Sequence, residues 1–502
     1  MYYNYLAGEL DTMTDTTASH VESAAVHLNE DWVSAIIGVT IFVLALLGLS
    51  GVDLLGWAAT TKIWTVPSAA LAPIGKSYAA LGGLPALVLT YLAFLGVLTG
   101  AAAVLGANVR RFALAFSAVF WLGYIAWIIG SYAHIAAATP ADIAKTGVSW
   151  SLHLTPEGGL ILALVAGLIV GNFFPNFATW LNEAIRPEFY VKTAIVILGG
   201  VIAITVAGKL NLASSVFLRS LAAIVEAYLI YWPVVYYISR KYFGFSREAA
   251  VPLASGISIC GVAAAIATGS AIRARPQVAV LVSSLVVIFA VVELLLLPFL
   301  ANTFLSHEPL VAASWLGLAV KTDGAAVAAG GIAESLISAK NAAAGIHYAP
   351  GWILGTTTTI KVFIDVFIGI WAFILAHIWT TYINPTTPGG KAKLSEIWER
   401  FPKFILGFIL TFALGLVVTL SLGKGQALAL KAVADEASVF RVLFFVLTFF
   451  SIGVLSDFRR LWADGLGKLA AVYVVSLFGF VIWVGLLISW LFFHGVKPPL
   501  AG

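Results

Sequence analysis

The sequence has 502 residues, of which 61% are hydrophobic and only 10% are charged, and its mean hydropathy is +0.99. Soluble domains are roughly 45–50% apolar and about 25% charged, because a surface in water needs polar side chains. A soluble enzyme is therefore excluded. Long apolar blocks near the ~20 residues of a membrane-spanning helix indicate an all-α polytopic membrane protein.

The remaining composition excludes several kinds of site. Cys260 is the single cysteine, so neither a disulfide framework nor a CxxC metal site can form, and we expect no metal. A net charge of +4 is too small to indicate nucleic-acid binding. The sequence has no His-Glu-x-x-His, Gly-x-Ser-x-Gly or Walker lysine motif, so we expect no catalytic residues and no enzymatic activity.

In chain order, residues 1–31 form an acidic N-terminal tail without the basic start and apolar core of a signal peptide. Accessory transmembrane helices follow at 32–136, then a linker at 137–156, a ten-helix core at 157–493 and a C-terminal tail at 494–502. About thirteen spans are predicted in total, at 32–50, 82–107, 112–136, 158–174, 190–207, 214–239, 249–271, 277–300, 312–331, 352–382, 402–421, 438–457 and 466–493.

Two further segments are amphipathic. Residues 176–188 predict an interfacial helix, and residues 332–348 predict either a similar helix or a short one outside the membrane. The core is predicted as two inverted repeats of five helices, at about 157–300 and 312–493, a common plan of secondary transporters. With the N-terminus in the cytoplasm, 13 Lys and Arg residues fall on the cytoplasmic side and 10 on the other, which favours that orientation.

A glycine-rich, hydroxyl-rich stretch at Ala254–Ser270 lies within the span predicted at 249–271, after Pro252. Glycines permit an unwound turn, and unwinding near Gly261 would create a helix N-terminus that attracts an anion. Ser255 and Ser258 could add hydroxyl donors. The alternative is small-residue helix packing without any ligand.

Charges within spans identify the other candidates. Lys321, Thr322 and Asp323 lie in a small-residue stretch, and they could alternatively mark a helix end in solvent. Lys361 and Asp365 share a helix face after four threonines, either as a substrate site or as a neutral structural pair. Glu226 and Glu293 lie in apolar surroundings, where a carboxylate can carry a proton, and Glu293 could instead pair with a nearby lysine or arginine.

Several motifs in the core resemble a known family. The run SGISICGVAAAIATGSAI is similar to the signature GTSICGASAIAA of the YeiH-type bacterial inner-membrane proteins, a group named for proposed sulfate export. Further matches occur in the same order along the chain, namely GLIVGN (167–172), KTAIVILGG (192–200), WLGLAV with AAVAAGG (315–331), TTTTIK (356–361) and SIGVLSDFRRL (451–461).

The resemblance implies a secondary transporter with about ten core helices, inverted repeats and discontinuous helices that cross near the membrane midplane. It implies sulfate or organic sulfonates as substrates. Two departures leave the substrate, direction and coupling ion open. Lys321-Thr322 stands where relatives often have His-Asp, and Lys361-Val362-Phe363-Ile364 replaces a Lys-Leu-Thr-Arg run.

These observations predict a multi-pass inner-membrane transporter that moves a small anion by alternating access, coupled to H⁺ or Na⁺ and without another cofactor. The alternatives are a bicarbonate or other small-anion carrier, a cation/proton antiporter, and a non-transporting receptor or scaffold. The expected partners are the anion and the bilayer, with a homodimer by analogy. The predicted substrate residues are Ser255, Gly256, Ser258, Cys260, Gly261, Thr322, Thr358 and Lys361, and the predicted coupling residues are Asp323, Asp365, Glu226 and Glu293.

Overall fold

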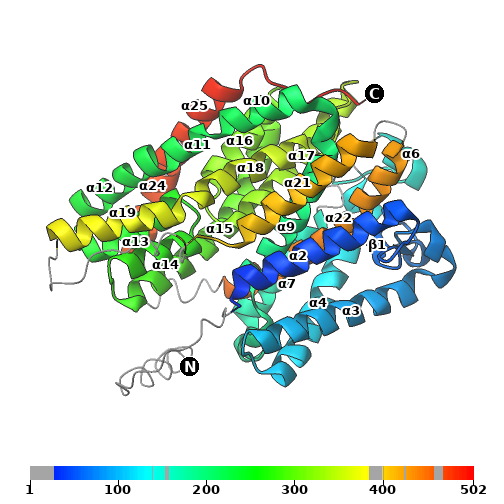
Figure 1. Cartoon of the computed structure of the whole chain (residues 1–502), viewed down its shortest axis with the longest axis horizontal. Coiled ribbons are helices and arrows are strands. Elements are labelled where there is room, and N and C mark those ends of the chain that lie inside the picture. The colour runs from blue at the N-terminus through cyan, green and yellow to red at the C-terminus, as the bar shows by residue number, and fades with distance from the viewer. Residues whose placement is uncertain are drawn as a thin grey trace.

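The computed structural model describes residues 28–137, 140–152, 158–383, 398, 401–422, 426–456 and 467–501 (Figure 1). Within them, nine helical segments are long and apolar enough to span a membrane, or ten if one bent pair counts as a single span. An all-α polytopic membrane protein is thereby confirmed, whereas the count of thirteen is not. Most of the predicted acidic tail, parts of the linker and residues 457–461 of the SIGVLSDFRRL match lie outside the described residues.

The N-terminal region contains three long helices, as predicted for residues 32–136: α2 (Glu30–Leu46), α3 (Gly83–Val104) and α4 (Val109–Gly130). Strands β1 (Ala59–Thr61) and β2 (Leu71–Pro73) pair as a short antiparallel ribbon between α2 and α3. The small helices α5 (Ala133–Ala136) and α6 (Pro140–Thr146) follow α4. These helices pack on the core, since α2 lies along α9 (Pro187–Val206) and α4 contacts α7 (Gly158–Phe173).

Helix α9 lies at the centre of the molecule and is buried along most of its length, as expected for a helix that is apolar on every side. It packs between α21 (Phe404–Leu422) and α22 (Ala427–Leu455). Before it, α8 (Pro175–Leu181) lies in a segment that turns 117° away from α7, near the amphipathic segment predicted at 176–188.

After α9 the chain continues through a 3₁₀ turn into a long interrupted helix. This helix comprises α10 (Leu210–Ser220), α11 (Ala222–Val225), a π-helical stretch (Glu226–Tyr231) and α12 (Trp232–Lys241). The predicted spans 190–207 and 214–239 therefore form one helical run from Pro187 to Lys241, with its interruption at Ala207–Lys209.

The span predicted at 249–271 is instead a re-entrant hairpin. Helix α13 (Arg247–Ser258) runs inward, and α14 (Val262–Ala271) returns beside it. The Arg275 backbone N–H donates to Glu248 Oε1 at 2.7 Å, and a Cβ on Gly269 would lie 3.4 Å from Pro252 Cγ. Both ends of this first hairpin thus lie on the same side, so it does not cross the membrane.

The span predicted at 312–331 is a second hairpin, formed by α16 (Pro309–Ala319) and α17 (Asp323–Ala343). Asn341 Nδ2 donates to the Ser306 carbonyl at 2.9 Å, which brings the far end of α17 back to the start of α16. Residues 332–343 continue α17, so the separate amphipathic segment predicted at 332–348 is wrong. The apolar, small-residue composition of both hairpins imitates that of a spanning helix.

The hairpins enter from opposite sides. Helix α15 (Pro276–Leu305) joins them and is about 45 Å long at 1.5 Å per residue, enough to cross a membrane. The first hairpin lies at its start and the second at its end, so their tips meet midway rather than crossing as two broken spans. The first hairpin is followed by α15 within the predicted repeat 157–300, and the second lies at the start of 312–493. The repeat boundaries therefore stay a prediction.

The remaining helices complete the core around the two hairpins. Helix α18 (Trp352–Val366) packs against both arms of the second hairpin and is followed by α19 (Ile368–Ile378). Near the C-terminus, α24 (Gly467–Ser476) continues through a π-helical turn into α25 (Ile482–Phe493), which packs against α16.

Candidate functional site

The tip of the first hairpin is Ile259–Gly261, between α13 and α14. Gly261 has φ +73°, a left-handed conformation that favours glycine, and a Cβ there would lie 2.6 Å from Val286 Cγ1 and 3.3 Å from the Lys321 carbonyl oxygen. The predicted interruption of the helix near Gly261 is therefore confirmed. Glycine at this position lets the first tip approach the backbone of the second.

The tip of the second hairpin is Val320–Thr322, and hydrogen bonds hold its backbone in place. The Lys321 N–H donates to Glu293 Oε2 at 2.9 Å, and Tyr473 Oη donates to Glu293 Oε1 at 2.8 Å. Thr322 caps α17 by accepting from the Ala325 N–H at 3.3 Å. Glu293 thus fixes the turn between two helices, while the coupling role predicted for it stays a prediction.

Lys361 joins the two tips. Its fully buried ammonium group donates to the carbonyls of Ile259 at 3.2 Å and Lys321 at 3.3 Å, and it lies 3.7 Å from Asp323 Oδ1. These carbonyls lie near the C-terminal ends of α13 and α16, where helix dipoles leave partial negative charge. A buried cation requires such compensation, because apolar surroundings do not replace its hydration.

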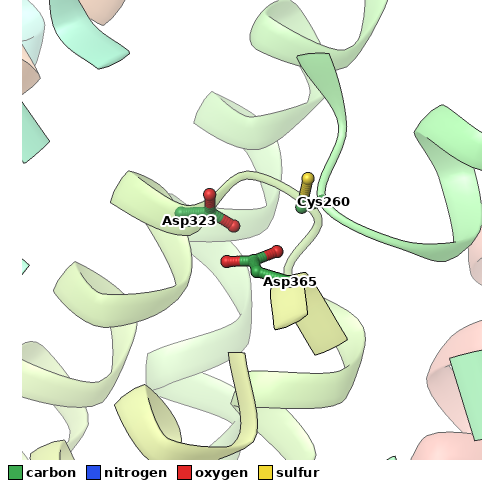
Figure 2. A group of neighbouring side chains, drawn as sticks. All are labelled: Cys260, Asp323 and Asp365. Atoms are coloured by element: carbon green, nitrogen blue, oxygen red, sulfur yellow. The ribbon is translucent and has the colours of Figure 1, made fainter. Parts of the chain in front are cut away.

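Two carboxylates and one thiol complete the site. Asp323 is the first residue of α17, where a negative charge is favourable. Asp365 lies one turn after Lys361, and Figure 2 shows the carboxylates of Asp323 and Asp365 facing each other beside Cys260 of the first tip. One ligand atom from each of the three lies within 4.8 Å of the other two, and Oδ1 of each aspartate lacks a hydrogen-bond partner.

Lys321 extends away from this group although its backbone belongs to the second tip. Its ammonium donates to the Leu318 carbonyl and lies 4.6 Å above the ring of Tyr231. Glu226, in the neighbouring π-helical stretch, is fully buried, and neither of its carboxylate oxygens has a hydrogen-bond partner. Glu226 therefore does not join Asp323 and Asp365, and its predicted coupling role stays a prediction.

The predicted hydroxyl groups differ in their availability. Ser255 donates to the Val251 carbonyl and accepts from Trp232 Nε1, and Thr358 donates to the Leu354 carbonyl. Ser258, next to the first tip, is buried with no hydrogen-bond partner. A Cβ on Gly256 would lie 2.8 Å from Val282 Cγ1, so this glycine serves close packing. Among the three hydroxyls, Ser258 is the one free to receive a ligand.

A narrow crevice reaches the second tip from the side where α9 begins. It has about 10 Å³ of room for water and is lined by residues that include Glu188, Val191, Thr322, Gly324 and Thr448. That space is about the size of one water, so the site is closed in this conformation.

Near the start of α9, ion pairs join α2 to the core. Lys192 Nζ lies 2.8 Å from Asp31 Oδ1, and Arg186 lies 2.8 Å from Glu30 Oε1. Helix α2 therefore contributes charged residues beside the crevice. This contact joins segments that are far apart in sequence, and the sequence did not predict it.

Sequence reasoning also missed Tyr231 and Tyr473. Tyrosines are common in membrane proteins as interfacial and packing residues, and no local pattern distinguished these two from the other fourteen. The signal that could have found Tyr473 is Glu293 itself, because a buried carboxylate needs a hydrogen-bond donor nearby.

Comparison with known proteins places the chain in a family of membrane proteins. The family model described as conserved hypothetical protein 698 matches residues 135–472. A UPF0324 membrane protein of Nitrosomonas europaea is 40% identical over 477 residues, which cover 94% of this chain and 97% of that protein. The similarity therefore includes N-terminal helices that precede the family model.

Two further relatives match shorter regions. An uncharacterised protein of Archaeoglobus fulgidus is 48% identical over 30% of this chain and 91% of its own length. A UPF0324 membrane protein of Rhodopirellula baltica is 30% identical over 60% of this chain and 51% of its own length. No solved structure matches the chain.

Proposed function

The chain belongs to the family described as conserved hypothetical protein 698, and we propose that it is a secondary transporter of small anions with its site at the two hairpin tips. The observation that carries this proposal is Lys361, a buried cation that contacts both tips and pairs with Asp323. Intramembrane charges in polytopic proteins commonly mark a substrate or ion pathway. Opposed discontinuous segments that meet near the midplane are typical of transporters.

In the closed conformation, the Asp323 carboxylate occupies the place that an anion would take beside Lys361. An incoming anion can replace it as the partner of Lys361 if Asp323 accepts a proton, because the total charge of the site then stays the same. Anion and proton would consequently bind together. A monovalent sulfonate requires one proton, whereas sulfate requires two, and Asp365 with its unpartnered Oδ1 is the second carrier.

Alternating access would follow from opening the hairpins one at a time. The crevice at Glu188 and Thr322 would widen on the side where α9 begins, while the other side stays closed. We place this side in the cytoplasm of a cell whose inner membrane holds the protein. Because the first hairpin turns back, Arg273 and Arg275 lie on the same side as Arg247. The number of Lys and Arg residues on the cytoplasmic side therefore rises from the predicted 13 to 15, and the number on the opposite side falls from 10 to 8.

Transport into proteoliposomes tests the proposal. Purified protein is reconstituted, and uptake of labelled sulfate, bicarbonate and methanesulfonate is measured with and without an inward proton gradient, with a pH dye inside the vesicles. We expect one of these anions to accumulate together with protons, and Asp323→Asn to abolish the dependence on the gradient. Lys340→Gln, which removes an exposed lysine from α17, serves as the control. If no anion exceeds empty vesicles under any gradient, anion transport is refuted.

A cation/proton exchanger is the second candidate, favoured by the group of Cys260, Asp323 and Asp365. Carboxylate oxygens bind hard cations such as Na⁺, and Lys361 would then compete with the cation for Asp323. Uptake of ²²Na⁺ in the absence of any permeant anion distinguishes the two functions. Sodium uptake that drives proton efflux and survives Lys361→Gln would favour the exchanger, whereas sodium-independent anion uptake excludes it.

A further inference from the structure

A second crevice lies on the side of the tips opposite to the first. It is enclosed by α10, α11, α16, α18 and α25, and its lining includes Arg219, Ser220, Ser314, Leu318 and Ile360. It too has about 10 Å³ of room for water. Helices α16 and α25 meet on this side, where Glu308 accepts from the Gly495 N–H at 3.0 Å. The two crevices therefore approach the second hairpin from the two faces of the membrane.

Arg219 is the charged residue in the lining of this crevice. Its guanidinium donates to Ser215 Oγ at 3.0 Å and to the Phe492 carbonyl, both of them neutral partners. Among the described residues, no carboxylate forms an ion pair with Arg219. The Arg219 side chain is half-buried, and its partners Ser215 and Phe492 are neutral, so the guanidinium has no carboxylate to displace before it binds an anion.

The surroundings of Arg219 suit an oxyanion. Ser489 Oγ donates to Ser314 Oγ at 2.9 Å, which leaves the Ser314 hydroxyl hydrogen for another acceptor. At its inner end the crevice touches Leu318, whose carbonyl accepts from the Lys321 ammonium, and Ile360, the neighbour of Lys361. The inner end of the crevice is thus lined by Leu318, which binds the Lys321 ammonium, and by the residue that precedes Lys361 in α18.

We propose that Arg219 and Ser314 form an entry site for an oxyanion, which a planar guanidinium binds through two parallel hydrogen bonds. The anion would bind first at Arg219 and then pass between Leu318 and Ile360 to Lys361. This inference rests on the proposed function, because it identifies the substrate class as oxyanions such as sulfate or a sulfonate. It also assigns this crevice as the route from the side that carries the C-terminal end of α25.

The test compares Arg219→Lys and Arg219→Gln with the native protein in proteoliposomes, with sulfate and methanesulfonate as probes. We expect KM to rise at least about tenfold in Arg219→Gln, because a charged hydrogen bond to the anion is lost. The rise should be smaller in Arg219→Lys, because lysine keeps the positive charge but cannot form the two parallel hydrogen bonds of a guanidinium. The maximal rate should change less than KM, because Lys361 is intact. Lys209→Gln, an exposed lysine before α10, controls for net charge.

Arg219 also binds the C-terminal end of α25 through the Phe492 carbonyl, so the melting temperature of each variant in detergent is measured in parallel. A purely structural role would lower the melting temperature and the maximal rate together and leave KM unchanged, which would overturn the entry site. If Lys361→Met abolishes uptake while Arg219→Gln transports with native KM, the entry site is wrong and the proposed function stands. If the native protein transports bicarbonate but neither probe, the substrate class assigned to the entry site is wrong, whereas the absence of uptake for all three anions refutes the proposed function.

Discussion

The two hairpins have similar small-residue sequences and meet at one point, yet their tips have different chemistry. The second hairpin carries its own charges, Lys321 in the tip and Asp323 at the start of α17, and the tip backbone is held by Glu293. The first tip is uncharged, and its Ile259 carbonyl receives the ammonium of Lys361 from α18. One hairpin is therefore fixed by the surrounding helices, whereas the other depends on a side chain that a ligand could recruit.

This difference assigns separate tasks to the hairpins. A tip held by a buried carboxylate and a tyrosine is suited to remain in place while its charges change partners. A glycine-rich tip held through Lys361 is suited to open once that lysine takes a new partner. We therefore expect the first hairpin to move more than the second during transport, and the following variants test the distinction.

Lys361→Met should have the largest effect, because it removes the contact that both tips share. It leaves the Asp323 carboxylate buried without a cation, and breaking a buried pair in this way costs about 3–5 kcal/mol. We expect transport at background level and a large fall in the melting temperature. In Lys361→Met/Asp323→Asn the stability loss should be smaller than the sum of the single losses. Additive losses would mean that Lys361 and Asp323 do not stabilise each other in the folded protein.

Gly261→Ala should have the next largest effect, and it acts on the first hairpin. With φ +73° and ψ −110°, Gly261 has a backbone conformation that other residues hardly adopt, a strain of about 1–3 kcal/mol, and the new Cβ would also collide with Val286. We expect transport to fall at least about tenfold. The matched control is Gly331→Ala in the second hairpin, where a Cβ would have no neighbour within 4 Å. Equal loss in both variants would show that the first tip has no special role.

The sequence predicted the residues at the hairpin tips better than it predicted the path of the chain through the membrane. Lys361, Asp323 and Asp365 stood out because charges are rare in apolar segments, and Gly261 stood out because it lies in a stretch rich in glycine and hydroxyl residues. The hairpins did not, because an apolar block of ~20 residues is read as a span whether or not it turns back. The contact that reveals the first turn joins Glu248 to Arg275, and no local periodicity encodes that pairing.

The same limit applies to interactions made across the fold. Glu293 was predicted as a proton carrier from its apolar neighbours, but its position is set by Lys321 and by Tyr473, 180 residues away. Tertiary contacts of this kind decide whether a buried carboxylate holds the backbone or moves protons. Sequence patterns report only that the carboxylate is buried.

Glu293→Gln tests which of these roles is correct. A glutamine keeps one acceptor oxygen, so either the Lys321 N–H or the Tyr473 hydroxyl loses its partner, which costs about 1–3 kcal/mol. We expect a lower melting temperature with proton-coupled uptake retained. Tyr473→Phe, which removes one of the two donors, should give a smaller shift in the same direction. Loss of proton coupling at native stability would instead make Glu293 a proton carrier.

Ser258→Ala should have the smallest effect and bears on the first hairpin alone. Its hydroxyl has no partner in the closed conformation, so its removal should leave the melting temperature unchanged. If the hydroxyl binds substrate after the tip opens, KM for the anion should rise a few-fold, as expected for one neutral hydrogen bond. Ser255→Ala provides the contrast, because it deprives buried Trp232 Nε1 of its acceptor and should lower stability without changing KM. A native KM in Ser258→Ala would place the anion's contacts on α18 and the second hairpin, so that the first hairpin acts only as the moving barrier.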